Sequence, residues 1–431
     1  MASGAQSGTA SWIAERRISA ATRASELAPP TRKDKRWEFT DISDLDLDGF
    51  TPAGEGDASA LERAESYLPG VDGAMRVDQV DGSALTEVPS DPGPEGPLVL
   101  SLDDAAEQYP DLVEPHLGSI VPAADRISAD NEAKWTGGAF VYVPAGTHVA
   151  EPIQLTVVHD TPGSALHWRT LIVVEESAEA EVWERWLSGS EDCDGLLNAT
   201  TEIVVGQNAN LRFVCGQELS EKTWVMGTQR GEIQRDATLD WVALGFGGGR
   251  GKVRMETKLA GRGSNAKVTG AYAVRGTQHL DFDTNQEHAA EDTTSDLAFR
   301  GILDDAATAV WWGMIVVDPG AQRTDAFQES RNLILSSDAH ADAIPGLEIQ
   351  ADDVACTHAA AIAQVDKEQL FYLQSRGLNT ESAKRLVIEG FLAEMVERLP
   401  EGPVHDAVAA ALEQRLDEVL GERPEQLEVV A

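Results

Sequence analysis

The chain has 431 residues, of which 42% are apolar, enough for a sizeable core and for more than one structural region. Asp and Glu total 73 against 34 Lys and Arg, a formal net charge of −39 that repels nucleic-acid phosphates and anionic membranes and excludes both as partners. The acidic residues spread along the whole length, a pattern typical of proteins from salt-accumulating halophiles.

The cysteines and the N-terminal sequence indicate the cellular compartment. Cys193, Cys215 and Cys356 form neither an even set nor a CxxC pair, so we expect no disulfide framework and no self-contained zinc or iron–sulfur site. The first ten residues lack the basic and apolar segments of an export signal. No apolar run approaches the roughly 20 residues of a membrane span. We therefore expect a cytoplasmic protein.

Residues 1–137 are predicted to form an N-terminal region of helices and loops. The sequence RWEFTD begins at Arg36, and we expect its Trp37 and Phe39 to anchor an extended segment to the body. The string DPGPEGP, from Asp91 to Pro97, is typical of a loop or linker. Helical patterns cover residues 11–28, 61–67 and 103–117.

Residues 138–364 are predicted to form a parallel β-helix core. Short runs of Val, Ile, Leu, Thr and Trp alternate with similar strings of small and polar residues, which begin near 175, 205, 234, 261 and 303. The first four recur about 27 to 30 residues apart, a spacing that indicates a solenoid. The next interval is longer. A β-sandwich of short strands is the structural alternative.

Residues 365–431 are predicted to form a C-terminal helical domain. Asp366 is a suitable N-cap with Gln369 three residues later, and Gly377 interrupts the pattern as a C-cap does. An apolar face then follows helical spacing and includes Phe391, and a last amphipathic helix covers 405–420. These helices either close the end of the β-helix or form a docking face for a partner.

Two motifs, a glycine-rich string and paired aspartates, are of kinds found in enzymes, but neither is strong evidence for an enzyme here. The glycine-rich string from Gly245 to Val253 lacks the first glycine and the Ser or Thr of a phosphate-binding loop, so we expect a turn and no ATP site. The rival function is a polysaccharide-active β-helix enzyme that uses paired aspartates, either Asp281 and Asp283 near His288, or Asp304 and Asp305. In so acidic a chain, paired aspartates are usually turns on a solvated face.

The pair Cys356-x-His358 is the third candidate site. Alternation places both side chains on one strand face with Val354 and Ile362, close enough to bind one metal or persulfide. Two ligands do not complete a tetrahedral site, so a cluster here needs ligands from another chain. The alternative is that both side chains lie in an apolar core.

The surrounding strings resemble one known family. RNLILS begins at Arg331, IPGLEIQADDVACTHAA at Ile344 and EQLFYLQSRGL at Glu368, and the resemblance also covers residues 304–328 and RWEFTD. These strings are similar to the SufB/SufD family, scaffold subunits of the SUF iron–sulfur cluster assembly system. The SufB branch usually carries a cysteine where this chain has Ala339-His340-Ala341, which favours the SufD branch.

The resemblance implies a right-handed parallel β-helix and a scaffold role without catalysis. It implies that His358 faces SufB, which supplies a cysteine, so that a transient Fe–S cluster forms between the two subunits and none is bound stably by this chain alone. Cys356 matches a family cysteine of less defined role. The helical domain is implied to bind the ATPase SufC, and we assign Glu389, Phe391 and Glu394 to that surface. Partners are thus SufB and SufC, with a homodimer as the alternative for the isolated chain.

Overall fold

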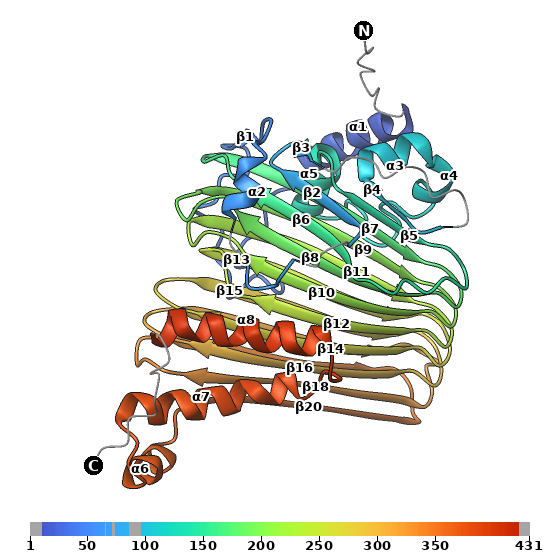
Figure 1. Cartoon of the computed structure of the whole chain (residues 1–431). Helices are drawn as coiled ribbons and strands as arrows, with labels where there is room; N and C mark the ends of the chain where they lie inside the picture. Colours follow the sequence, from blue (N-terminus) through green and yellow to red (C-terminus); the bar gives the residue numbers. More distant parts are fainter. Residues whose placement is uncertain (1–10, 65, 71–73, 86–95, 422–431) are drawn as a thin grey trace.

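The computed structural model describes residues 11–64, 66–70, 74–85 and 96–421. Its centre is a parallel β-helix in which successive strands alternate between two stacked sheets (Figure 1). The odd-numbered strands from β5 onward belong to the first sheet and the even-numbered strands from β6 onward to the second. One strand of each sheet makes one rung. The predicted parallel β-helix with helical regions at both ends is therefore confirmed, and the sandwich alternative is wrong.

Each sheet is a ladder of neighbours about 30 residues apart in sequence. The first sheet runs in the order β4 (Leu98–Ser101), β5 (Ala139–Val143), β7 (Ser164–Val174), β9 (Gly195–Val205), β11 (Thr223–Ile233), β13 (Arg250–Leu259), β15 (His279–His288), β17 (Thr308–Val317) and β19 (His340–Ile349). The second sheet runs in the order β3 (Ser83–Ala84), β2 (Arg76–Val80), β6 (Ile153–His159), β8 (Glu179–Ser188), β10 (Asn210–Glu218), β12 (Thr238–Gly245), β14 (Asn265–Val274), β16 (Thr294–Leu303), β18 (Thr324–Ile334) and β20 (Val354–Gln364).

A left-handed backbone position recurs at one edge of the β-helix and explains the repeated strings. It occurs every 27 to 31 residues, at Ser177, Asn208, Asp236, Gly263, Asp292 and Arg323. Asp, Asn and Gly adopt this conformation at low cost. Each of these N–H groups donates to a carbonyl of the next rung, as Ser177 does to Gln207 at 2.8 Å. The string near 303 lies between β16 and β17, at the opposite edge, and this is why its interval is longer.

The space between the sheets is filled by inward-facing side chains that alternate along each strand. Val, Leu and Ile stack from rung to rung with Trp168, Trp241 and Trp311, all fully buried. The inward side chains of a rung stabilise the fold only when neighbouring rungs cover them, because each rung contacts just the rungs before and after it. The first and last rungs therefore need separate covers.

The N-terminal region covers the first rungs and also extends the sheets. Helix α1 (Ser11–Glu26) packs on α5 (Arg126–Lys134), and α2 (Ser59–Arg63), α3 (Leu102–Gln108) and α4 (Pro110–Val113) lie between strands. Strands β2 and β4 pair with β6 and β5, and β1 (Thr51–Pro52) pairs with β7. The sequence did not predict these strands or α5. Most of the predicted linker DPGPEGP lies outside the described residues.

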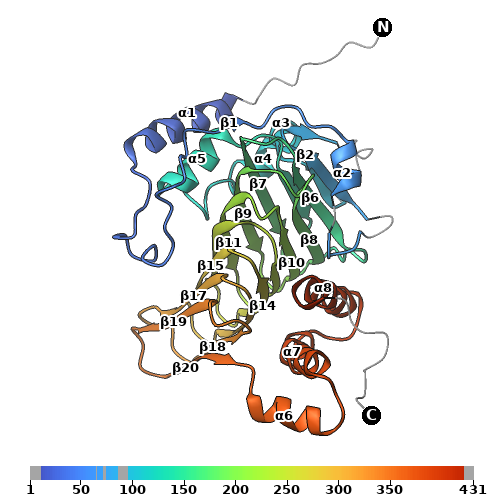
Figure 2. The same ribbon diagram turned by 90° about the vertical axis from the view of Figure 1, so that its left-hand side faces the viewer.

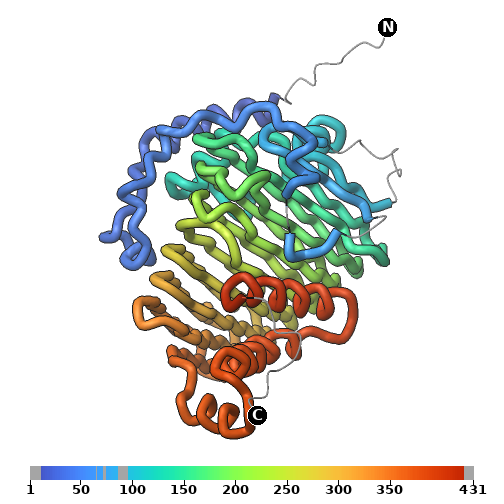
Figure 3. The backbone as a smooth tube through the Cα atoms, turned by 60° about the vertical axis from the view of Figure 1, so that its left-hand side comes forward, coloured from blue at the N-terminus to red at the C-terminus, as the bar shows by residue number. Residues whose placement is uncertain are grey.

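A segment without regular structure, residues 27–50, leaves α1 and descends along the outside of the first sheet (Figures 2 and 3). It contacts β13, β15 and β17. Phe39 lies 6.4 Å from Trp312, ring centre to ring centre, and the Lys252 ammonium lies 5.4 Å from the Trp37 ring centre. Trp37 and Phe39 thus anchor this segment, as predicted from RWEFTD. We call residues 36–41 the strap.

The C-terminal helices follow β20 after two residues. The side chain of Asp366 caps α6 (Lys367–Ser375) by accepting from the Glu368 N–H at 2.8 Å. Helices α7 (Thr380–Val396) and α8 (Pro403–Leu420) pack across the second sheet, whereas α6 projects beyond the last rung (Figures 1 and 2). None of the helices in the described parts of the chain is both long and apolar enough to span a bilayer.

Candidate functional site at the open end of the β-helix

Within the described residues, no strand pairs beyond the last rung, β19 and β20. There β19 pairs with β17 and β20 with β18, and the opposite edge of each strand leaves its backbone N–H and C=O groups free of strand partners. The inward apolar side chains of this rung lack a covering rung, and Leu347, Ile349 and Ile362 are 37%, 41% and 48% exposed. We call this surface the open end. Exposed apolar patches beside unpaired edges are typical of protein–protein interfaces.

Cys356 and His358 lie on the inward face of this rung. In the register of the second sheet, Cys356 stands next to Ala326 and His358 next to Gln328, and both partners are buried in the interior. Because no rung of the described chain covers β20, His358 is exposed and Cys356 half-buried. The alternative that both side chains lie in an apolar core is therefore wrong for His358. Partial burial raises the pKa of the Cys356 thiol, as does the nearby carboxylate of Asp325.

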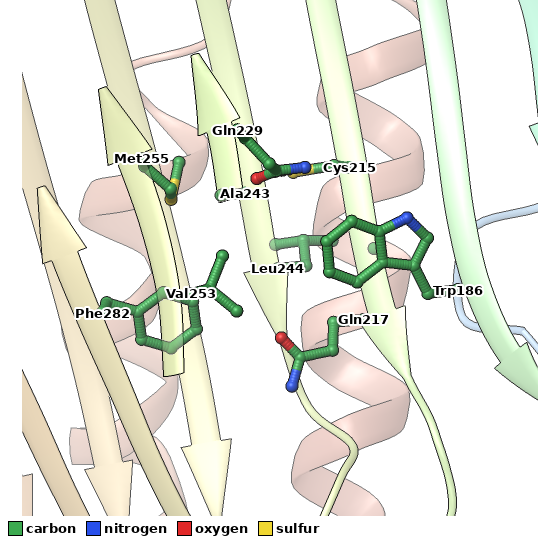
Figure 4. Close-up of a pocket in the computed structure, with 10 residues that line it drawn as sticks. Trp186, Cys215, Gln217, Gln229, Ala243, Leu244, Val253, Met255 and Phe282 are labelled. Atoms are coloured by element: carbon green, nitrogen blue, oxygen red, sulfur yellow. Dashed lines mark hydrogen bonds between the residues drawn. The ribbon is translucent and has the colours of Figure 1, made fainter. Parts of the chain in front are cut away.

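The other two cysteines do not join this pair. Cys193 and Cys215 are fully or nearly buried. Cys215 lines a cavity of about 10 Å³ between the sheets, room for about one water, with its sulfur 3.8 Å from the Gln229 amide oxygen (Figure 4). Burial raises the pKa of the Cys215 thiol to about 12. Across the described residues, no three His, Cys, Asp or Glu side chains gather closely enough to hold a metal ion.

The glycine-rich string is a turn between β12 and β13, as predicted. It lies at an edge of the β-helix and leads into a strand rather than a helix, so no helix N-terminus faces a phosphate here. Its lysine, Lys252, is 2% exposed on the outer face of β13, where Nζ lies 2.7 Å from Asp281 Oδ2. This lysine is committed to a buried ion pair.

The aspartates of the rival enzyme interpretation lie beneath the strap. Asp281 and Asp283 are buried on the outer face of β15. Thr40 of the strap donates to Asp281 at 2.5 Å, and Arg36 pairs with Asp283 at 3.2 Å. Burial raises the pKa of Asp281 to about 6 although Lys252 opposes the shift. These carboxylates hold the strap on the sheet and are closed to a polymeric substrate.

His288 does not complete that constellation. It lies on the inward face of the same strand, where its ring nitrogens bond the hydroxyls of Thr293 and Ser295 at 2.8 and 2.9 Å. A period of two applied to positions 281, 283 and 288 would already have separated them. Asp304 and Asp305 form a turn, with Asp305 in the left-handed region and bonded to the Gly276 N–H at 3.0 Å. Neither aspartate pair supports the enzyme interpretation.

The residues assigned to the partner surface contact their own chain. Glu394 of α7 lies 2.8 Å from the buried Arg300 guanidinium on β16. Arg300 also lies 5.8 Å from the Phe391 ring centre. Glu389 pairs with Arg385 one helical turn earlier at 2.8 Å. The large apolar side chains that face solvent on this domain are instead Phe371 and Tyr372 of α6 and Leu386 of α7.

The sequence did not predict a cleft of about 640 Å³ that lies between Arg63, Ser66 and Tyr67, the edge loops after β8 and β10, and the end of α8. Glu218 lies in its wall and accepts from the Tyr67 N–H at 2.8 Å. Burial raises the pKa of Glu218 to about 7. Tyr67 also contacts Arg415 of α8 at 3.4 Å, so the cleft joins parts of the chain that are remote in sequence.

Comparisons with known proteins agree with this architecture. Residues 157–391 match the family model described as SUF system FeS cluster assembly, SufBD core domain, and residues 4–155 match the SufBD protein N-terminal region. The chain is 29% identical over 411 residues to the iron–sulfur cluster assembly protein SufD of Bacillus subtilis, covering 94% of each chain. It is 31% identical over 313 residues to a SufBD family protein of Mycobacterium tuberculosis, covering 70% of this chain and 77% of that one. Similarity to SufB of Bacillus subtilis is 26% over 343 residues, covering 79% and 72%.

Proposed function

Because this chain belongs to the SufB/SufD family of iron–sulfur cluster assembly proteins, we propose that it is a non-catalytic scaffold subunit that pairs with SufB at the open end and docks the ATPase SufC on its C-terminal helices. The nascent cluster is the cargo of this scaffold and forms between the two subunits. The observation that carries the proposal is the exposed His358 beside Cys356 on the inward face of an uncovered rung.

The open end supports pairing with a second β-helix. Its edge strands offer unpaired backbone groups, and its apolar side chains regain burial only when another rung covers them. Full burial of an exposed Leu or Ile is worth about 1.5–3 kcal/mol, and covering these side chains, which are less than half exposed, contributes a corresponding fraction of that each. A SufB protein with a matching rung supplies both, and a second copy of this chain is the alternative occupant.

The ligand set supports a shared site rather than a resident cluster. An imidazole nitrogen and a thiolate are both ligands that iron accepts. This chain offers one of each at the open end, while Cys193 and Cys215 are buried elsewhere in the β-helix. We therefore propose that SufB supplies the remaining ligands. The isolated chain then binds no stable cluster.

The connection between β20 and α6 supports a role for ATP. Only Val365 and Asp366 separate the strand that carries His358 from the helix that carries the exposed Phe371. A SufC that holds α6 and changes shape on binding ATP would displace β20 directly, since a capped two-residue connection absorbs little movement. We propose that this opens the interface at the cluster site.

The test is replacement of His358 in the complex. His358→Ala removes an exposed ligand from an edge strand, so the chain should fold and co-purify with SufB and SufC normally. Cluster absorbance, iron and sulfide per assembled complex should fall at least tenfold, the scale on which metal sites lose affinity when a supporting group is removed.

His340→Ala is the matched control. His340 is also exposed on the last rung, but it lies at the start of β19, on the outer face beside Asp342 at 3.2 Å. This variant should keep the full cluster load. A full load on His358→Ala complexes, or a stoichiometric cluster on the isolated wild-type monomer, would contradict the proposal.

A further inference from the structure

Gln328 occupies the inward face of β18 next to His358 in the register of the second sheet (Figure 1 shows the two strands). Its side chain is fully buried and crosses the interior to the other sheet. Nε2 donates to the Gly313 carbonyl of β17 at 3.3 Å and to the Gly346 carbonyl of β19 at 3.1 Å. Only the nitrogen of an amide can donate, so these two bonds fix the orientation of the whole group.

The amide oxygen of Gln328 has no such partner. Among the described residues, no donor reaches this buried Oε1. Gly313 leaves room for it, because a Cβ at that position would lie 2.7 Å from the oxygen. Leaving a buried carbonyl oxygen unpaired costs about 1–3 kcal/mol. A nearby donor would remove that cost.

We propose that Gln328 is a positioning residue for His358: its Oε1 accepts the N–H of one ring nitrogen and holds the imidazole in a single tautomer. The lone pair of the other nitrogen then points out of the open end, toward the partner subunit. Side chains in register on neighbouring strands start about 4.8 Å apart, so rotation about χ1 turns the exposed imidazole inward, toward the Gln328 amide. Ligating histidines are usually oriented by such a bond. The inference rests on the proposed role of His358.

The experiment observes the tautomer directly, in the full-length chain without partners. Histidine ring nitrogens are labelled with ¹⁵N and observed by NMR, and His358→Gln identifies the resonances. The wild type should show one predominant tautomer for His358. Gln328→Leu removes the acceptor at similar volume, and the tautomer ratio should then shift to that of an unconstrained imidazole.

Two further variants separate positioning from packing. Gln286 is the matched control, because it is a buried interior glutamine of β15 whose amide atoms have no partner among the described residues. Gln286→Leu should leave the His358 tautomer unchanged. Gln328→Met also removes the acceptor, on an unbranched side chain, and should give the same change in tautomer ratio, which provides a second readout if Gln328→Leu folds poorly.

Equal tautomer ratios in the wild type and a folded Gln328→Leu would overturn the inference. In the complex with SufB and SufC, Gln328→Leu should lower cluster yield about tenfold, like loss of other groups that orient a ligand. A changed tautomer with full cluster yield would overturn the positioning role. Failure of the proposed function is a separate result, since it appears as a full cluster load on His358→Ala complexes.

Discussion

At the scale of single residues, the proposed functional site and a group that affects stability lie in different parts of the fold. His358 and Cys356 are accessible because the β-helix ends at their rung. Glu218 is the opposite case, a carboxyl group enclosed between the second sheet and the segment around Tyr67. Its pKa is raised by burial from an ordinary 4.5 to about 7, so the folded protein binds this proton more tightly than the unfolded chain does. Because proton binding at Glu218 is coupled to folding, the dependence of stability on pH provides a test.

A group with a raised folded-state pKa contributes stability that is complete below its unfolded pKa and is lost as pH rises through the folded value. Glu218→Gln removes this titration and keeps an acceptor for the Tyr67 N–H. Relative to wild type, the variant should therefore gain stability between pH 5 and 8, on the order of 2 kcal/mol after solvent screening is allowed for. Melting curves at several pH values measure it. Glu191→Gln, an exposed carboxylate of the same cleft, should show no such gain.

At the scale of elements, the C-terminal helices divide into an attached pair and a projecting one. α7 is held on the second sheet through Glu394 and the buried Arg300, and α8 packs across β14. α6 buries none of its residues, and its Phe371 is 73% exposed. An aromatic side chain displayed on a rigid helix is the usual anchor of a protein interface. We therefore propose that the centre of the surface that binds SufC lies on α6.

Phe371→Ala should weaken SufC binding about tenfold, which corresponds to ~1.4 kcal/mol, without changing the melting temperature. Titration calorimetry with purified SufC measures the affinity. Ile18→Ala is the control, because Ile18 is 68% exposed on α1, outside the C-terminal domain. Glu394→Lys should act differently: it sets a third cation against Arg300 and Arg331, and should lower the melting temperature. Undiminished binding by Phe371→Ala would remove α6 from the interface.

At the scale of the whole molecule, the excess of acid decides the response to salt. With 73 Asp and Glu against 34 Lys and Arg, 39 carboxylates remain in excess when each cation is matched to one carboxylate. Surface ion pairs such as Arg323 with Asp292 weaken as salt rises, but repulsion among the excess carboxylates weakens as well. At a net charge of −39, we expect the repulsion among excess carboxylates to outweigh the attraction within surface ion pairs.

The melting temperature should thus rise by several degrees from dilute to molar KCl. The expected curve climbs most steeply at low salt, where the screening length changes most. Calorimetry across a KCl series measures it, and a flat or falling curve would contradict the proposed halophilic origin.

The sequence by itself determined the local pattern. Turn residues that tolerate the left-handed conformation, such as Asn208 and Asp236, recur once per rung, and alternation puts Cys356 and His358 on one strand face. The N-cap of α6 at Asp366 could be predicted for the same reason. Each of these features depends on neighbours within a few residues or on a regular repeat, and both are visible in a linear chain.

Only the tertiary structure decided which faces are covered. His358 is exposed because no rung follows β20 in the part of the chain that the structure describes. Asp281 is covered because the strap, some 240 residues earlier in sequence, lies over it. Likewise, Glu394 forms an ion pair because α7 packs against β16, which carries Arg300, 94 residues earlier in sequence. Burial and pairing of this kind depend on contacts between segments that are remote in sequence. Local sequence patterns do not predict those contacts.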